Sequence, residues 1–88
     1  MNDYVIKWKK SAVKELQCLP KDIAIKILDA VTQLQRNPHP INSKKLKVVR
    51  NHYRLKISEY RVLYSIFDLE LIIEIIKVSH RKDAYKQL

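Results

Sequence analysis

The sequence predicts an α+β fold with an N-terminal strand, a helical hairpin and then a three-stranded antiparallel meander, the helices covering one face of the sheet. Apolar residues follow a helical period in the first part of the chain and alternate with polar residues after residue 53. The 88 residues include no glycine, no repeat and no low-complexity tract that would divide them. We therefore expect residues 1–88 to form a single domain with one core.

The first predicted elements are a strand and a helix. Residues 4–8 form a short, aromatic and β-branched run, which is typical of a strand. Ser11 is a candidate N-cap for a helix over residues 12–19, because its hydroxyl can accept a hydrogen bond from the first turn. Glu15 on this helix is expected to decorate the exposed face.

A second helix is predicted after Pro20, because proline is tolerated in the first turn of a helix. Its apolar residues recur at helical spacing and form one stripe: Ile23, Ile27, Ala30, Val31 and Leu34. Pro38 disfavours helical backbone at Asn37 and offers no N–H donor, so the helix must end there. The two helices are therefore expected to form a hairpin.

The last part of the chain predicts three strands. After a basic connector at residues 44–47, the period of apolar residues changes to two, which indicates half-buried strands at residues 53–58 and 60–66. A third strand covers residues 71–79. Because the links between these strands are short, we expect an antiparallel meander.

The charge of the chain favours a polyanionic partner. Eighteen Lys and Arg against nine Asp and Glu give a net charge of +9, which favours nucleic acid, an anionic membrane or an acidic protein. The membrane is the weakest of these, because no apolar run reaches the roughly 18 residues that a span needs and no signal-peptide region is present. A cytoplasmic protein is expected. Cys18 is the single cysteine and is expected to be a packed, inert thiol.

The alternation of the strands predicts a cationic face. Arg54 and Lys56 share a face, and Arg61 joins them if the hairpin keeps the complementary register. Any one lysine is explained as an edge-strand residue that prevents aggregation. The three cations together favour an anion-binding site, because like charges on one face repel one another unless a bound anion offsets them. The candidate RNA-binding residues are the arginine of the strand over residues 53–58 and the three lysines of the connector: Arg54, Lys44, Lys45 and Lys47.

The C-terminal segment adds three side chains with suitable chemistry. A histidine exchanges protons near neutral pH, an arginine stabilises a phosphorane, and a tyrosine stacks on an unpaired base; these are His80, Arg81 and Tyr85. Their alternative roles are capping or packing of the chain end. RNA cleavage through the 2′-hydroxyl of the substrate needs no metal, and the sequence contains no HExxH motif and no glycine-rich phosphate loop. We therefore expect no metal and no cofactor.

Three motifs in combination resemble the RelE/ParE toxin superfamily: YRLKI at residues 53–57, YRVLY at 60–64 and VSHRKDAY at 78–85. The likeness extends over nearly the whole chain. It implies a toxin that enters the ribosomal A site and cleaves messenger RNA. It also implies a cognate RelB-like antitoxin, encoded beside the toxin, that holds it inactive in a toxin–antitoxin hetero-oligomer.

The resemblance also suggests roles for five residues, all proposed as catalytic. By its position in the motif, Lys56 resembles a superfamily residue that acts as a base or contacts the phosphate. Arg61 resembles an arginine that stabilises the phosphate, and Arg81 resembles an arginine near the scissile phosphate. Tyr85 resembles a tyrosine that stacks on or orients the nucleotide. His80 matches a general acid that only some members have, so the sequence leaves open whether His80 or Arg81 is the acid.

The chain departs from the superfamily pattern at three positions. Arg54 replaces a lysine, which keeps the charge but removes a proton donor, because guanidinium stays protonated. Ser58 and Ser79 stand where many relatives have glycine. Two other functions remain open: inhibition of DNA gyrase, as in ParE-type toxins, or binding of an antitoxin by a catalytically inactive relative.

Overall fold

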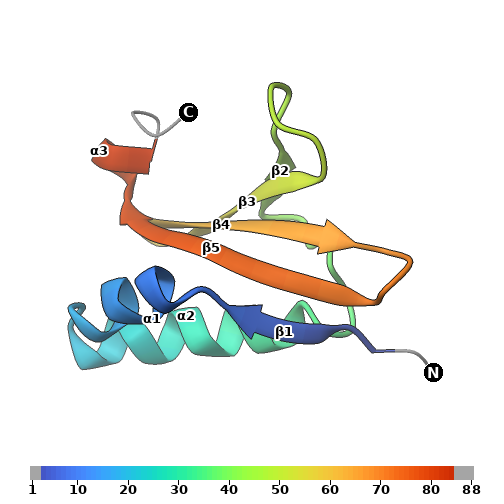
Figure 1. The fold of residues 1–88 in the computed structure, drawn as a ribbon. Helices are drawn as coiled ribbons and strands as arrows, with labels where there is room; N and C mark the ends of the chain where they lie inside the picture. Colours follow the sequence, from blue (N-terminus) through green and yellow to red (C-terminus); the bar gives the residue numbers. More distant parts are fainter. Residues whose placement is uncertain (1–2, 85–88) are drawn as a thin grey trace.

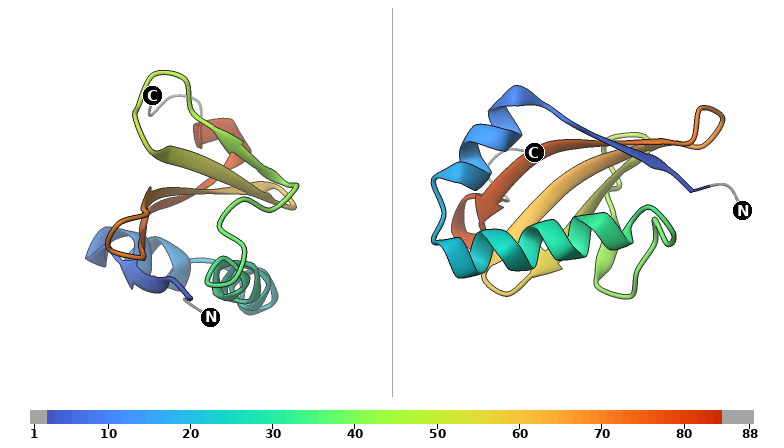
Figure 2. Two further views of the ribbon diagram at one scale, coloured as in Figure 1. Left: turned by 90° about the vertical axis from the view of Figure 1, so that its right-hand side faces the viewer. Right: turned by 90° about the horizontal axis from the view of Figure 1, so that it is seen from below.

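The chain forms two layers, a five-stranded sheet and the helices that cover one of its faces, in a computed structural model that describes residues 3–84 (Figure 1). In chain order the elements are β1 (Val5–Trp8), α1 (Lys10–Gln17), α2 (Lys21–Gln33), β2 (Ser43–Lys45), β3 (His52–Ile57), β4 (Tyr60–Phe67), β5 (Ile72–His80) and α3 (Arg81–Ala84). α1 and α2 both lie below the sheet and meet at a corner (Figure 2). The predicted α+β class is confirmed.

The strands follow the order β1-β5-β4-β3-β2. β3, β4 and β5 form the predicted antiparallel meander, and β1 pairs in parallel with β5, so the first and last strands are neighbours. Within residues 3–84, no helix has the length and apolar character needed to cross a membrane.

The prediction of a connector over residues 44–47 is wrong in part, because Ser43–Lys45 forms the edge strand β2 against β3. Asn42 fixes this pairing from both sides. Its carbonyl accepts the Lys56 N–H at 2.9 Å, and its side-chain amide donates to the Lys56 carbonyl at 2.7 Å. Asn42 thus fastens the start of the basic segment to the sheet, next to the backbone pairing of β2 with β3.

The core lies between the helices and the sheet. Its buried members come from both layers: Ala12, Leu16, Ile27, Val31, Leu34, Leu55, Val62, Tyr64, Ile66, Ile73, Ile75 and Val78. The apolar stripe predicted for the second helix is confirmed, since Ile27, Val31 and Leu34 are buried.

Two predictions about the first helix are wrong. α1 begins at Lys10, so Ser11 lies inside the helix, and Lys9 occupies the N-cap position without a side-chain cap. The strand decides this boundary, because the Lys9 N–H still donates to the Ile75 carbonyl at 3.0 Å and the helix starts directly after it. Cys18 is exposed and not packed, since it is the C-cap residue beyond the last core-facing turn.

A bulge in β5 changes which of its residues face the core. Leu63 pairs with Lys77 and Tyr64 with Ile75, so Ile76 is an extra residue on β5. The buried positions are therefore Ile75 and then Val78. Without the bulge, strict alternation after Ile75 would turn the Lys77 ammonium toward the core, at a high desolvation cost.

Glu15 joins α1 to the bulged end of β5. The β1–β5 pairing ends at Trp8 and Ile75, which leaves the next stretch of β5 paired with β4 but without a strand on its other side. Glu15 accepts the Val78 N–H at 2.9 Å through Oε1 and the Lys77 ammonium at 2.7 Å through Oε2. The expectation that Glu15 decorates the exposed face is therefore wrong.

Candidate functional site

The strand register gathers four cations on the sheet face opposite the helices. Lys44 lies directly across from Arg54, and Lys56 lies directly across from Arg61. Leu55 is buried toward the helices, so the residues on either side of it point to the other face. We call this group the basic cluster: Lys44, Arg54, Lys56 and Arg61.

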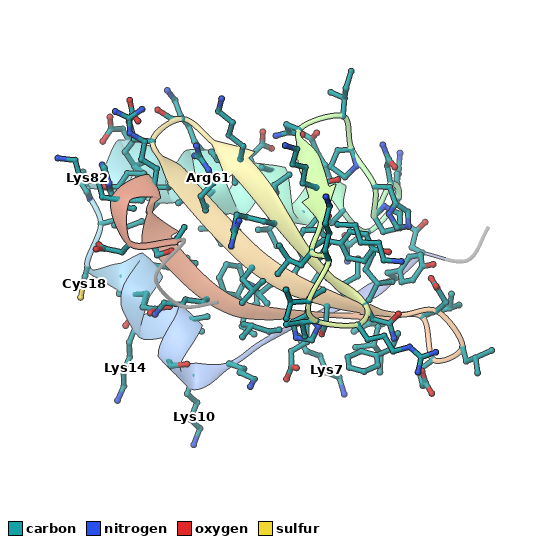
Figure 3. All side chains as sticks on the ribbon, turned by 90° about the horizontal axis from the view of Figure 1, so that it is seen from above. Lys7, Lys10, Lys14, Cys18, Arg61 and Lys82 are labelled. Atoms are coloured by element: carbon teal, nitrogen blue, oxygen red, sulfur yellow. The ribbon has the colours of Figure 1, made fainter. Side chains whose placement is uncertain are left out.

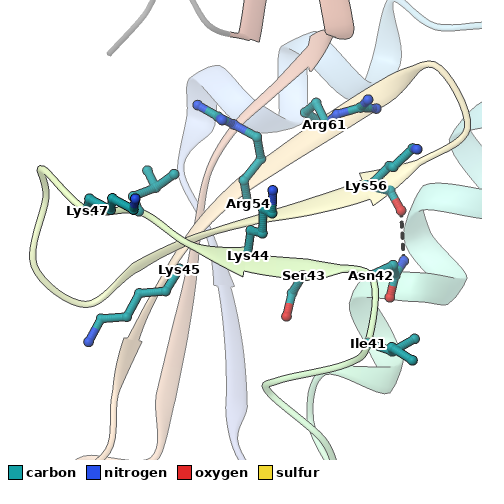
Figure 4. Close-up of a pocket in the computed structure, with 10 residues that line it drawn as sticks. Ile41, Asn42, Ser43, Lys44, Lys45, Lys47, Arg54, Lys56 and Arg61 are labelled. Atoms are coloured by element: carbon teal, nitrogen blue, oxygen red, sulfur yellow. Dashed lines mark hydrogen bonds between the residues drawn. The ribbon is translucent and has the colours of Figure 1, made fainter.

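The basic cluster lines a groove of about 560 Å³ between β2, β3 and the start of β4 (Figure 4). Cations supply six of its ten lining residues and none is acidic, the full set being Ile41, Asn42, Ser43, Lys44, Lys45, Leu46, Lys47, Arg54, Lys56 and Arg61. Such a surface attracts the phosphates of an extended strand.

The three connector lysines are not equivalent. Lys44 points toward Arg54, whereas Lys45 points away from the groove (Figure 4). Lys45 pairs with Tyr53, whose ring stacks on the buried Tyr64 at a centroid distance of 5.7 Å, so their side of β2 and β3 faces the helix layer. Lys47 lies in the loop that closes one end of the groove.

Tyr64 also anchors the segment that leads into β2. Its buried hydroxyl donates to the Pro38 carbonyl at 2.8 Å. Burial raises the pKa of Tyr64 above its usual 10.0, and the charge of a nearby Tyr53 adds to this, while a contact with Ser43 opposes it. The segment that leads into β2, and with it one wall of the groove, is thus held by the neutral, buried hydroxyl of Tyr64.

The two arginines of the basic cluster are held by backbone carbonyls. Arg61 Nη1 donates to the carbonyls of Ser58 at 3.1 Å and Tyr60 at 2.9 Å. Ser58 has φ 53°, the left-handed conformation in which glycine is unstrained. Arg54 Nη2 donates to the Ala84 carbonyl at 3.4 Å and so connects β3 to α3. A guanidinium has five N–H donors, so these contacts orient Arg61 and leave donors for an anion.

Arg81 lies at the same corner of the sheet as the turn that holds Arg61. Its N–H donates to the Glu59 carbonyl at 2.7 Å, and its Nε contacts Glu59 Oε2 at 2.9 Å. Both side chains of this ion pair are more than half exposed, so it contributes little to stability and can exchange for another anion.

His80 is not brought to the basic cluster. His80 lies across from Tyr60, on the helix side of the sheet, and the centroids of the two rings are 5.4 Å apart in an edge-on arrangement. Its Nδ1 accepts the Lys82 N–H at 3.2 Å. Tyr85 lies outside the described residues.

Sequence reasoning missed two residues that build this region. Asn42 fixes β2, and Glu59 holds Arg81; the only sequence signal is an acidic residue in a tight turn between two basic strands. In the part of the chain that the structure describes, no three or more His, Cys, Asp or Glu side chains gather where they could hold a metal ion.

Residues 6–85 match the family described as ParE toxin of type II toxin-antitoxin system, parDE. The chain is 34% identical to a putative RelE-like toxin protein of Escherichia coli, with 93% of this chain and 90% of that protein covered. It is 35% identical to the putative toxin RelE1 of Methanocaldococcus jannaschii, with 88% and 89% covered.

Solved structures give the same result. The RelE–RelB complex from Pyrococcus horikoshii OT3 matches with a TM-score of 0.82 and 32% identity, over 96% of this chain and 100% of that one. The RelBE2 toxin–antitoxin complex from Mycobacterium tuberculosis matches with a TM-score of 0.79 and 26% identity, over 90% and 99% of the two chains.

Proposed function

The chain belongs to the RelE/ParE superfamily of type II toxin–antitoxin toxins, and from this premise we propose that it is a ribonuclease that cuts messenger RNA on the ribosome without a metal. The observation that carries the proposal is the basic cluster. Four cations from three strands line one groove that has no acidic lining residue, so the groove fits the phosphates of a single RNA strand.

In the proposed reaction the substrate supplies its own nucleophile. The 2′-hydroxyl attacks the adjacent phosphorus, the bond to the 5′-oxygen breaks, and a 2′,3′-cyclic phosphate forms. Arg61 and Arg81 stabilise the charge that develops on the phosphoryl oxygens, and both are already held at the turn between β3 and β4. Lys56, directly across from Arg61, contacts the phosphate or accepts the proton of the 2′-hydroxyl.

The remaining proposed roles belong to the C-terminal end. The leaving 5′-oxygen needs a proton, for which His80 and Arg81 are both candidates. The position of His80 against Tyr60 means that its ring must turn from the helix side to reach the groove. Tyr85 follows α3, whose last carbonyl is held by Arg54, and is proposed to stack on a base at the cut.

A RelB-like antitoxin is the proposed partner, because the solved relatives are complexes with RelB. We propose that an acidic, amphipathic segment of this antitoxin places carboxylates near Arg61 and Arg81 and neutralises the groove. A complex that suppresses toxicity while both arginines stay accessible would contradict this charge masking.

The test is single-turnover cleavage of messenger RNA on programmed ribosomes. Wild type should cut in EDTA and leave a 2′,3′-cyclic or 3′-phosphate end. It should cut free RNA poorly, because an open groove does not impose in-line geometry on a flexible strand. Replacing the 2′-hydroxyl at the cut by hydrogen should abolish cleavage but not binding. Efficient cutting of this 2′-deoxy substrate would refute the mechanism.

A matched pair of variants tests the site itself. Arg61→Ala should lower the cleavage rate by about 10²–10³-fold, the usual loss for one donor to a developing anion. Lys45→Ala removes the same charge, but from the face of β2 that points away from the groove. Its effect on the cleavage rate should be at least about tenfold smaller, because no contact to the reacting phosphate is lost. Equal losses in the two variants would show that net charge, and not the basic cluster, matters.

A second candidate function is binding and inhibition of DNA gyrase, because the matched family description is that of ParE. Gyrase supercoiling with purified toxin decides between the two. Inhibition of supercoiling by a protein that leaves messenger RNA intact on ribosomes would favour the ParE-type function.

A further inference from the structure

A second group of lysines lies at the edge of the sheet farthest from the groove. Lys7 is on β1, Lys9 joins that strand to α1, and Lys10 and Lys14 lie one turn apart on α1. All four are exposed, and Lys7, Lys10 and Lys14 project into solvent along this edge (Figure 3). We call these four residues the edge lysines.

The charge of the edge lysines is offset locally at one position, where Glu74 on β5 lies directly across from Lys7. Among the described residues, the two ion pairs are Lys77–Glu15 and Arg81–Glu59, so neither includes an edge lysine. Glu15, the acidic residue on α1, is turned toward Lys77 and the Val78 N–H. The two exposed charges of α1 are therefore both positive, Lys10 and Lys14.

The other helix shows that this imbalance is local. The exposed charges of α2 are Lys21, Asp22, Lys26 and Asp29, which sum to zero. By contrast, α1 has no acidic residue in its first turn, and Lys10 and Lys14 repel each other at the spacing of one turn. A polyanion bound to the α1 surface would relieve this repulsion. The α2 surface has no net charge that would attract a polyanion.

The edge lysines and the basic cluster are too far apart to act as one site. The basic cluster begins with Arg61 on β4, two strand spacings or about 10 Å from β1, and ends with Lys44 on β2, four spacings or about 19 Å from β1; both distances exceed the Debye length of about 8 Å at physiological salt. The basic cluster also faces away from the helices, because its β3 residues flank the buried Leu55, whereas α1 lies on the helix side of the sheet (Figure 1). One RNA strand in the groove leaves the edge lysines uncovered, but a folded RNA that surrounds the protein can reach both.

We propose that the edge lysines bind backbone phosphates of the folded RNA that surrounds the cut strand, and so dock the toxin for cleavage. This inference rests on the proposed function. A membrane surface fits less well, because the apolar side chains of α1 that would enter lipid, Ala12 and Leu16, are buried in the core.

The test compares two double variants that each remove two charges from a helix surface. Lys10→Gln with Lys14→Gln changes the edge lysines, and Lys21→Gln with Lys26→Gln is the matched control on α2. Glutamine forms helices about as well as lysine, so both variants should melt near the wild-type temperature. Binding is measured between 50 and 200 mM salt on ribosomes programmed with the 2′-deoxy message, which separates docking from cleavage.

The edge variant should bind about tenfold more weakly at 150 mM salt, and its slope of log affinity against log salt should be shallower by about 1–2. The control should change affinity by less than about twofold. With cleavable message, the loss should appear in the ribosome concentration at half-maximal rate and much less in the maximal rate.

Equal affinities of the two variants would overturn the inference while leaving the proposed function intact, provided that wild type cuts. A wild type that does not cut programmed ribosomes would instead overturn the proposed function. A larger loss of the edge variant on a 20-base-pair DNA duplex or on anionic vesicles than on ribosomes would assign the surface to that partner and refute RNA docking.

Discussion

Replacing Glu15 should destabilise the protein in a way that reports one backbone hydrogen bond. Glu15→Ala removes the acceptor of the Val78 N–H and the partner of Lys77 together. Glu15→Gln keeps a side-chain carbonyl for the Val78 N–H and removes only the charge. The pair of variants therefore separates the backbone contact from the ion pair.

The two contributions differ in size. Val78 is only 4% exposed, so leaving its N–H without an acceptor should cost about 1–3 kcal/mol. The ion pair should contribute about 0.5–1 kcal/mol, because its side chains stay 28% and 29% exposed and water screens them. We expect losses in the free energy of unfolding of about 1.5–4 kcal/mol for Glu15→Ala and about 0.5–1 kcal/mol for Glu15→Gln.

Urea unfolding followed by far-ultraviolet circular dichroism measures these losses, and amide hydrogen exchange at Val78 reports the bond directly. Asp29→Ala is the control, since Asp29 is an exposed helical acid whose contact with Gln33 is long, at 3.3 Å; it should change stability by less than about 0.5 kcal/mol. If Glu15→Gln is as damaging as Glu15→Ala, or if Val78 exchange does not change in the alanine variant, the proposed role of Glu15 is wrong.

Two further predictions concern scaffold and pH. Ile73→Ala should lower the free energy of unfolding by about 2–5 kcal/mol, because Ile73 is fully buried. Arg61→Ala should instead melt near the wild-type temperature and lose cleavage. A large fall in the melting temperature of Arg61→Ala would show that Arg61 has a structural role. Tyr64→Phe should cost about 1 kcal/mol near neutral pH. Because burial raises the pKa of Tyr64, the stability from its neutral form is present below pH 10.0 and is lost as pH rises through the folded-state value, so the phenylalanine variant should lack this alkaline loss in pH-dependent melts.

The cationic face could be predicted from the sequence because two local rules determine it. Alternation puts Arg54 and Lys56 on one face of their strand. A two-residue turn pairs Ile57 with Tyr60, which then sets Lys56 directly across from Arg61. Both rules act between residues close in the chain, so the sequence contains all the information they need.

Positions that depend on distant segments could not be predicted in this way. Lys44 and Lys45 are adjacent and identical in sequence, and only the pairing of β2 with β3 turns one into the groove and the other away. Glu15 lies 62 residues from Lys77, and nothing near either residue indicates that contact.

The sequence alone therefore determined the α+β class, the helical stripe and the basic strands, since the periods of 3.6 and 2 are set by local backbone geometry. Tertiary structure alone decided the edge strand, the start of α1, the bulge at Ile76 and the side of the sheet on which His80 lies. In each of these cases a hydrogen bond or a desolvation cost between remote segments selects among local conformations that differ little in energy.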